Sequence, residues 1–301
     1  MPDPARPFTV QLREGVALSG EESGPTEAGP AVPAGEEIGA GAAGTSPPVV
    51  LLHGLTATRR YVVMGSSALA RAGWRVIAYD ARGHGRSGAA ADPRDYGYQR
   101  LAQDLAGVLD ARGVDRALLA GASMGAHTAV RFALDHPERV AALAIVTPAF
   151  EVKPNPFARA AELERWDALA RGLREGGVEG FVAAYQLASV PERWRATVEA
   201  VLRQRLSAHE HPLAVADALE AVPRSRPFDR LNQLAQIAVP TLVVGSRDDA
   251  DPGHPLAVAE RYAEAIPGAR LLVEEPGHSP LAWQGGRLSR AIAGLADRMR
   301  V

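Results

Sequence analysis

The chain has 301 residues, of which 47% are hydrophobic and 23% are charged, and it contains no cysteine. This length can bury a sizeable core, and the lack of cysteine excludes disulfides, thiolate metal sites and a cysteine nucleophile. With 33 basic and 35 acidic residues the net charge is −2, so no overall basic charge favours nucleic-acid binding.

The sequence shows no targeting or membrane signal. Residues 1–7 hold no apolar run, which argues against a secretory signal. The longest apolar stretches, such as Val140–Val146, are far shorter than the roughly 20 residues that a membrane span needs. We therefore expect a cytoplasmic protein without a transmembrane segment.

The chain begins with two short strand-like runs, Phe8–Leu12 and Val16–Leu18, around a turn signal at Glu14–Gly15. The stretch 20–48 then loses all periodicity: it holds seven Gly, five Pro, six Ala and five Glu, and no Lys, Arg or aromatic residue. Such a composition is typical of a flexible segment. We interpret it as an insertion, because strands of the same sheet are predicted on both sides of it.

From residue 49 the chain alternates short apolar runs with amphipathic stretches. The predicted strands are 49–52, 75–79, 117–120 and 140–146, and the predicted helices between them are 61–71, 98–112 and 124–134. Alternating strands and helices indicate a mostly parallel sheet that helices cover on both faces.

The strand signal disappears between residues 148 and 238, where amphipathic helical stretches take its place. Alternation resumes with strands 239–244 and 270–273 and helices 255–265 and 288–299. One α/β domain, formed by 1–147 and 239–301, is therefore predicted to be interrupted by a helical insertion at 148–238.

A G-x-S-x-G motif, Gly121 to Gly125, lies between a predicted strand and a predicted helix. A nucleophile on such a sharp turn has positive φ and crowds its neighbours, so small residues are needed two positions before and after it. Gly121 and Gly125 meet this need. We predict Ser123 as the nucleophile, and the backbone N–H of Met124, at the helix start, as one oxyanion donor.

A serine hydroxyl needs a base, usually a histidine that a carboxylate orients. His278 follows the last predicted strand, and the loops after parallel strands meet at one edge of the sheet. It is the preferred base. His53, His84 and His254 lie in loops at the same edge, so the residues alone leave other bases open.

Three carboxylates follow the predicted strand 239–244. Asp248 is preferred, because it comes three residues after Gly245, where the loop first turns. Asp249 and Asp251 remain alternatives, and Asp251 could instead cap the next helix. The resulting chain order of serine, aspartate and histidine is the one found in α/β-hydrolases.

The second oxyanion donor is expected in the loop after Leu52. Gly54 lets the backbone approach a substrate closely, and we favour the N–H of Leu55. His53 would then hold this loop. His209 and His211 form an H-x-H pair, but two ligands are too few for a zinc site, and we expect neither a metal nor a cofactor.

Taken together, these motifs resemble the α/β-hydrolase fold superfamily, in particular its cap-bearing serine esterases and lipases. The matching pieces are His53-Gly54, the run Asp80 to Ser87, Gly121 to Gly125, Asp248 and Gly277-His278. The resemblance implies a central sheet flanked by helices and a helical cap formed by 148–238. It also implies that Asp80 to Ser87 is a structural turn, which makes His84 a poor base.

The function expected on these grounds is hydrolysis of a small-molecule carboxylic ester, or of a related thioester or lactone, through an acyl-enzyme. One alternative is a cofactor-free perhydrolase or haloperoxidase-like enzyme with the same triad. Another is a ligand-binding protein that has lost catalysis. Epoxide hydrolases and haloalkane dehalogenases of this fold use aspartate where this chain has Ser123. The oligomeric state is left open.

Overall fold

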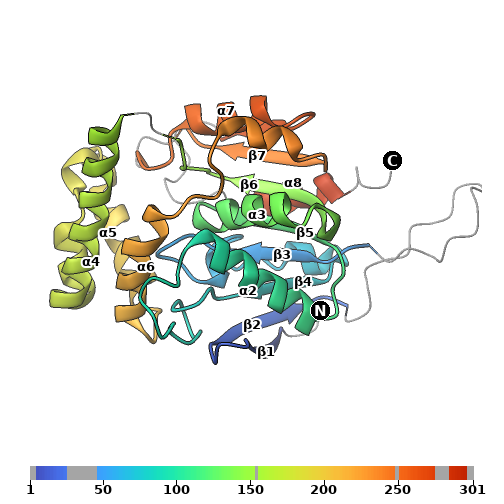
Figure 1. Cartoon of the computed structure of the whole chain (residues 1–301), viewed down its shortest axis with the longest axis horizontal. Coiled ribbons are helices and arrows are strands. Elements are labelled where there is room, and N and C mark those ends of the chain that lie inside the picture. The colour runs from blue at the N-terminus through green and yellow to red at the C-terminus, as the bar shows by residue number, and fades with distance from the viewer. Residues whose placement is uncertain (1–4, 26–45, 153–154, 248–250, 275–284, 297–301) are drawn as a thin grey trace, which may run out of the picture.

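A computed structural model describes residues 5–25, 46–152, 155–247, 251–274 and 285–296 (Figure 1). In these residues eight strands form one sheet in the order β1-β2-β4-β3-β5-β6-β7-β8. Strands β1 and β2 are antiparallel to their neighbours, and the pairs from β4 to β8 are parallel. In chain order the strands are β1 (Arg6–Gln11), β2 (Ala17–Ser23), β3 (Val49–Leu52), β4 (Val76–Tyr79), β5 (Ala117–Ala122), β6 (Val140–Val146), β7 (Thr241–Gly245) and β8 (Arg270–Val273).

Helices cover both faces of the sheet, as the alternating pattern predicted. In β3, Val50 and Leu52 join the core beneath α2 (Tyr98–Ala111), α3 (Met124–Asp135) and α7 (Leu256–Ala265). Val49 and Leu51 point to the other face, where α1 (Ala68–Arg71) and α8 (Gly285–Ala296) pack.

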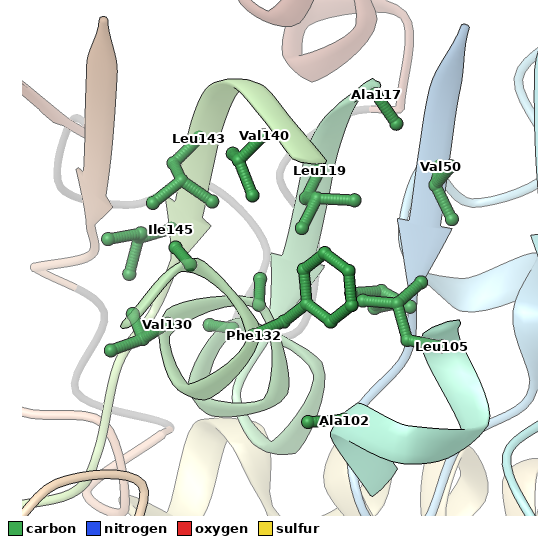
Figure 2. Close-up of a cluster of buried hydrophobic side chains, with 14 of the residues drawn as sticks. Val50, Ala102, Leu105, Ala117, Leu119, Val130, Phe132, Val140, Leu143 and Ile145 are labelled. Atoms are coloured by element: carbon green, nitrogen blue, oxygen red, sulfur yellow. The ribbon is translucent and has the colours of Figure 1, made fainter. Parts of the chain in front are cut away.

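The inner strands of the sheet are apolar at successive positions, because their side chains alternate between two buried faces. Figure 2 shows the first of these cores, with Phe132 of α3 and Leu105 of α2 against Leu119 and Val50 of the sheet. The fold is therefore the α/β architecture expected from the sequence.

The segment between β6 and β7 is helical. It contains α4 (Pro156–Ala184), the short 3-10 helix η3 (Leu187–Ser189), α5 (Glu192–Leu206) and α6 (Pro212–Arg224). We call α4, η3, α5 and α6 the helical insertion; its three α-helices lie together at one end of the sheet (Figure 1). Its apolar side chains share a buried cluster with Leu55, from the loop after β3, and with Met124, which follows Ser123 in the nucleophile motif. No helix within the described ranges is both long and apolar enough to cross a membrane.

The early part of the chain differs from the sequence prediction. Residues 20–23, expected to begin a flexible stretch, continue β2. Glu22 is only 2% exposed, because the guanidinium groups of Arg75 and Arg112 bind its carboxylate. The composition of 20–48 could not indicate these partners, because they lie far away in the sequence. Residues 26–45 lie outside the described residues.

The predicted helix 61–71 is also wrong in extent. The structure has a short 3-10 helix, η1 (Arg59–Tyr61), and then α1. Met64 and Gly65 between them have positive φ values of 49° and 70°, which a continuous right-handed helix does not allow.

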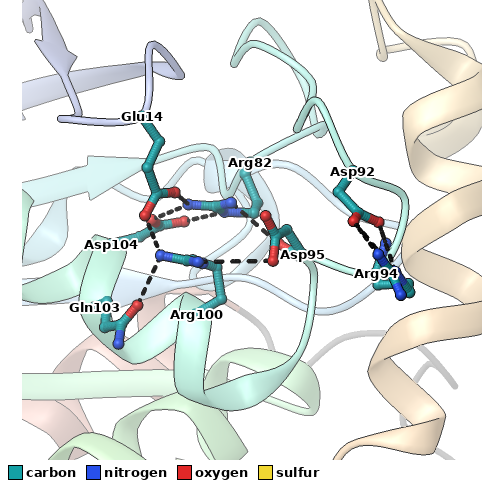
Figure 3. Close-up of polar contacts among 8 residues, drawn as sticks. All are labelled: Glu14, Arg82, Asp92, Arg94, Asp95, Arg100, Gln103 and Asp104. Carbon is teal, nitrogen blue, oxygen red and sulfur yellow. Dashed lines mark hydrogen bonds and ion pairs between the residues drawn. The ribbon is translucent and has the colours of Figure 1, made fainter.

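The turn from Asp80 to Ser87 is held by buried polar contacts. The Arg82 Nε donates to Asp104 of α2 at 2.6 Å, and the two side chains are only 1% and 3% exposed. Figure 3 shows this pair with Glu14 and Asp95 around the same guanidinium. The Arg82–Asp104 pair therefore holds the turn against α2, in agreement with the structural role expected for it.

Candidate active site

Ser123 occupies the sharp turn between β5 and α3. Its φ is 51° and its ψ −113°, a strained backbone conformation for a residue with a side chain. A Cβ at Gly121 would lie 2.2 Å from the Gly125 carbonyl oxygen, and one at Gly125 would lie 2.0 Å from the Leu52 carbonyl oxygen. The two glycines are needed for this close packing, as the sequence argument required.

His254 provides the contact that a serine nucleophile needs. Its Nε2 lies 2.8 Å from the Ser123 Oγ. Its Nδ1 faces both carboxylate oxygens of Asp251, at 2.9 and 2.8 Å. With Nδ1 protonated, the lone pair of Nε2 points at the hydroxyl, which is the arrangement of a nucleophile, a base and an orienting acid.

The two residues come from one short segment between β7 and α7. The His254 N–H donates to the Asp251 carbonyl oxygen at 3.2 Å, so the backbone turns back across Pro252 and Gly253. This turn brings the acid and the base side by side, although they are only three positions apart. The spacing Asp-Pro-Gly-His is the sequence signal that could have indicated the pair.

Of the predicted triad, only Ser123 lies in the described part of the chain. Asp248 and His278 fall outside it, so their roles stay predictions. The described structure brings Asp251, an alternative acid in the sequence analysis, to His254, which was one of the other loop histidines at this edge.

His254 and Asp251 stabilise each other's charged forms. Burial alone would lower the pKa of His254, but the adjacent Asp251 carboxylate outweighs it and holds that pKa above its usual value of 6.5. Burial would raise the pKa of Asp251, yet the imidazole of His254 and then the guanidinium of Arg205 keep it below its ordinary range. At neutral pH Asp251 is therefore a carboxylate, which stabilises the imidazolium form of His254.

The two predicted oxyanion donors flank the serine. Leu55 and Met124 line one cavity together with Ser123, and in the described residues neither backbone N–H donates to a protein acceptor. His84 holds the adjoining Leu55–Thr56 peptide, because its Nε2 contacts the Leu55 carbonyl oxygen at 2.5 Å. His53 accepts from the Ala81 N–H at 2.9 Å and contacts the Gly54 carbonyl oxygen, so it holds the loop as predicted.

The other buried histidines also have structural contacts. The Nε2 of His127 accepts from the N–H groups of Ala149 and Phe150, each at 3.1 Å. Burial, and then the neighbouring His254, lowers the pKa of His127 to about 3, so it stays neutral. His209 of the H-x-H pair accepts from the Gly85 N–H at 2.8 Å and links the helical insertion to the core.

Two small cavities meet at Ser123. The first, of about 90 Å³, is lined by Ser123, Asp251, His254 and Arg205 among others, and we call it the Arg205 cavity. The second, of about 70 Å³, has Trp166 in its wall, and we call it the Trp166 cavity. Its apolar lining residues include Leu55, Tyr98, Met124 and Phe150.

A larger groove of about 800 Å³ lies elsewhere, between the helical insertion and the loop around Arg94. Its arginines are paired: Arg174 binds Glu220 at 2.6 Å, and Arg224 binds Asp167 at 2.7 Å. Ser123, His254 and Asp251 do not line it, so the two small cavities are the candidate site.

Comparison with known proteins agrees with the fold described above. Residues 47–284 match the family described as alpha/beta hydrolase fold. Over 231 residues, 76% of this chain and 82% of the relative, the sequence is 35% identical to an Azorhizobium caulinodans protein named "Putative carbamate hydrolase RutD". A thermophilic esterase from Thermogutta terrifontis is 27% identical, with a TM-score of 0.73 and coverage of 99% of this chain and 100% of that one. A hydrolase from Pseudomonas aeruginosa is 25% identical, with a TM-score of 0.72 and 99% coverage of both chains.

Proposed function

The chain belongs to the α/β-hydrolase family, and from this we propose that it is a serine hydrolase that cleaves a carboxylic ester, or a related thioester or lactone, through an acyl-enzyme. The observation that carries the proposal is the 2.8 Å contact between the Ser123 Oγ and the Nε2 of His254, whose Nδ1 faces Asp251. The triad needs no cofactor or metal. The helical insertion acts as a cap over the site.

In the first half-reaction the Nε2 of His254 accepts the hydroxyl proton while the Ser123 Oγ attacks the carbonyl carbon. The negative charge that develops on the carbonyl oxygen is held by the N–H groups of Leu55 and Met124; removing one such donor typically costs about 3–4 kcal/mol of transition-state stabilisation. The imidazolium of His254 then gives its proton to the leaving group, whose bond to the carbonyl carbon breaks.

In the second half-reaction a water molecule attacks the acyl-enzyme. His254 takes a proton from the water, and the tetrahedral intermediate collapses to release the carboxylic acid. The proton returns to the Ser123 Oγ. Asp251 stays ionised throughout and stabilises the imidazolium that forms twice in each turnover.

The base can be tested directly, because the sequence and the described structure favour different histidines. His254→Gln is expected to lower kcat for a p-nitrophenyl ester by about 10⁶-fold, since removing the base leaves only the catalysis that oxyanion stabilisation and binding supply. His278→Gln is expected to change kcat by less than about threefold. The opposite result would restore the predicted roles of His278 and Asp248 and refute the assignment of His254.

A carbamate is the second candidate substrate, because the 35% identical relative carries that activity in its name. The same triad serves, since Ser123 would attack a carbamate carbonyl and His254 would protonate the leaving atom. Ester and carbamate substrates with the same p-nitrophenol leaving group separate the two. A kcat/KM higher for the esters supports an esterase, and one higher for the carbamates supports a carbamate hydrolase.

Nucleophilic catalysis itself is tested by Ser123→Ala, which is expected to abolish both activities. A variant that keeps more than about a tenth of the wild-type turnover would exclude Ser123 as the nucleophile.

A further inference from the structure

Arg205 is a positively charged residue of the site that has no role in the proposed acyl transfer. It lies on α5 of the helical insertion and lines the Arg205 cavity beside Ser123, Asp251 and His254. Its Cζ lies 5.2 Å from the centre of the Tyr61 ring, an orienting cation–π contact. Its Nε is buried and has no hydrogen-bond partner among the described residues.

Other arginines of the helical insertion are neutralised. Arg203, two positions earlier on α5, binds Glu179 and Glu199, each at 2.7 Å. Arg174 binds Glu220. Within the described ranges, no carboxylate lies within ion-pair distance of the Arg205 side chain. This difference distinguishes Arg205 from a surface arginine in a solvated ion-pair network.

The acidic groups of the cavity have other partners. The Asp251 carboxylate binds the Nδ1 of His254, and the Glu274 carboxylate accepts from the Ser246 hydroxyl at 2.7 Å. Asp251 raises the pKa of Arg205 by charge attraction alone, without a hydrogen bond. A guanidinium stays protonated even where burial lowers its pKa, as it does for Arg205. Among the described residues this half-buried charge has no direct ionic partner, which is costly, and a bound anion would remove that cost.

We propose that Arg205 binds a carboxylate of the substrate, so that the preferred substrates of Ser123 are monoanionic esters or carbamates. The planar fork of the guanidinium suits a carboxylate, which can accept two parallel N–H bonds. Asp251 and Glu274 line the same small cavity and disfavour a doubly charged group such as a phosphate monoester. The uncharged part of the substrate then enters the apolar Trp166 cavity.

This inference rests on the proposed function, and substrate pairs that differ in one charge test it. The anionic members are mono-p-nitrophenyl succinate, glutarate and adipate; the neutral members are p-nitrophenyl butyrate, valerate and hexanoate. Acetoxyacetate against ethyl acetate places the charge on the alcohol side. For at least one pair, Arg205→Gln is expected to lower kcat/KM for the anionic member by about 10- to 100-fold, the usual worth of a charge-assisted hydrogen bond.

The matched control is Arg203→Gln, which removes the same charge from the same helix outside the cavity. It is expected to leave every pair unchanged within about twofold. Arg205→Gln removes a charge that also acts on Asp251, so both members of a pair can lose activity, but the anionic member should lose at least about tenfold more kcat/KM than the neutral one. Arg205→Lys should recover part of this difference through KM. Equal losses for both members of every pair, or no loss for any anionic member, would overturn the proposal.

Binding without turnover separates this proposal from the proposed function. The probes are the unreactive amides succinamate, which is anionic, and butyramide, which is neutral, each titrated calorimetrically into the wild type and Arg205→Gln. Tighter binding of succinamate by at least about tenfold, lost in Arg205→Gln, supports the anion site even if no ester is hydrolysed. Equal binding of the two amides, or binding of neither, refutes it even if Ser123 proves to be a nucleophile.

Discussion

The substitution Asp251→Asn probes how the triad is tuned. Both carboxylate oxygens lie within 2.9 Å of the His254 Nδ1, so the wild-type ring is held with its proton on Nδ1. Asparagine has nearly the same shape but no charge. Its amide can donate to Nδ1, which would leave the proton on Nε2, facing the Ser123 hydroxyl, where the base needs a lone pair.

The size of the effect follows from two losses. The charge-assisted bond that stabilises the imidazolium is worth about 1.5–3 kcal/mol, or about 10- to 150-fold in rate. The misplaced proton adds to this, and the same change in a serine-protease triad lowers kcat by about 10⁴-fold. We therefore expect kcat to fall by about 10²–10⁴-fold.

The pH profile gives an independent readout. The Asp251 carboxylate holds the pKa of His254 above its usual 6.5, while burial lowers it. Without the carboxylate only the lowering influences remain, so the pKa falls. Because the base acts only when neutral, the low-pH decline of kcat/KM, centred above pH 6.5 in the wild type, is expected to move to lower pH in Asp251→Asn.

The assay is hydrolysis of a p-nitrophenyl ester across pH, with Asp248→Asn as the reciprocal variant. We expect Asp248→Asn to keep the wild-type kcat within about threefold and to leave the low-pH decline in place. A variant Asp251→Asn with unchanged kcat and an unchanged pH profile would refute this assignment. A collapse in Asp248→Asn alone would return the acid to the residue that sequence reasoning preferred.

Three further substitutions test the parts that position the site. His84→Ala removes the contact that holds the Leu55–Thr56 peptide, so kcat in the ester assay is expected to fall at least about tenfold with little change in KM, because Leu55 and the oxyanion donor on its other side are then less well positioned. Asp104→Ala leaves Arg82 buried without its partner and is expected to lower the free energy of unfolding in urea by about 3–5 kcal/mol. Gly125→Ala places a Cβ against backbone and is expected to abolish activity and reduce the Tm.

Each of these substitutions has a control in the same molecule. His136→Ala, the control for His84→Ala, alters a side chain that is 44% exposed and should change kcat little. Arg100→Gln, the control for Asp104→Ala, alters a side chain that is 30% exposed and should change the free energy of unfolding little. Gly294→Ala adds a methyl group with nothing within 4 Å on α8, and should stabilise by up to about 1 kcal/mol. A control with the same effect as its matched substitution would show that the loss is general, and the corresponding structural explanation would be wrong.

Much of the fold was visible in the sequence because local patterns determine it. The run 140–146 appears as a strand with the expected bounds, since parallel strands buried on both faces are short and continuously apolar. The run 270–273 also has the expected bounds, although it is a partly exposed strand at the edge of the sheet. The nucleophile turn was predictable for the same reason, because the packing around Ser123 excludes all but glycine at two fixed positions.

The features that the sequence left undecided depend on long-range or loop geometry. Several loop histidines are expected at one edge of the sheet, and only the turn from Asp251 to His254 shows which described one meets Ser123. The burial of Glu22 depends on arginines more than 50 positions away in the chain. The position of Arg205 beside the triad likewise depends on how the helical insertion packs, which its helical pattern does not specify.

The assignment of Ser123 as the nucleophile and His254 as its base is tested most directly by the rate at which a fluorophosphonate probe modifies the protein. The modified residue is identified by mass spectrometry. The reagent forms a stable bond to a serine only when a neighbouring base removes its proton. We predict a single adduct on Ser123, formed at least about 100-fold more slowly in His254→Gln and at nearly the wild-type rate in His278→Gln. An adduct on another residue would contradict the assignment of Ser123, and unchanged labelling of His254→Gln would contradict the assignment of His254.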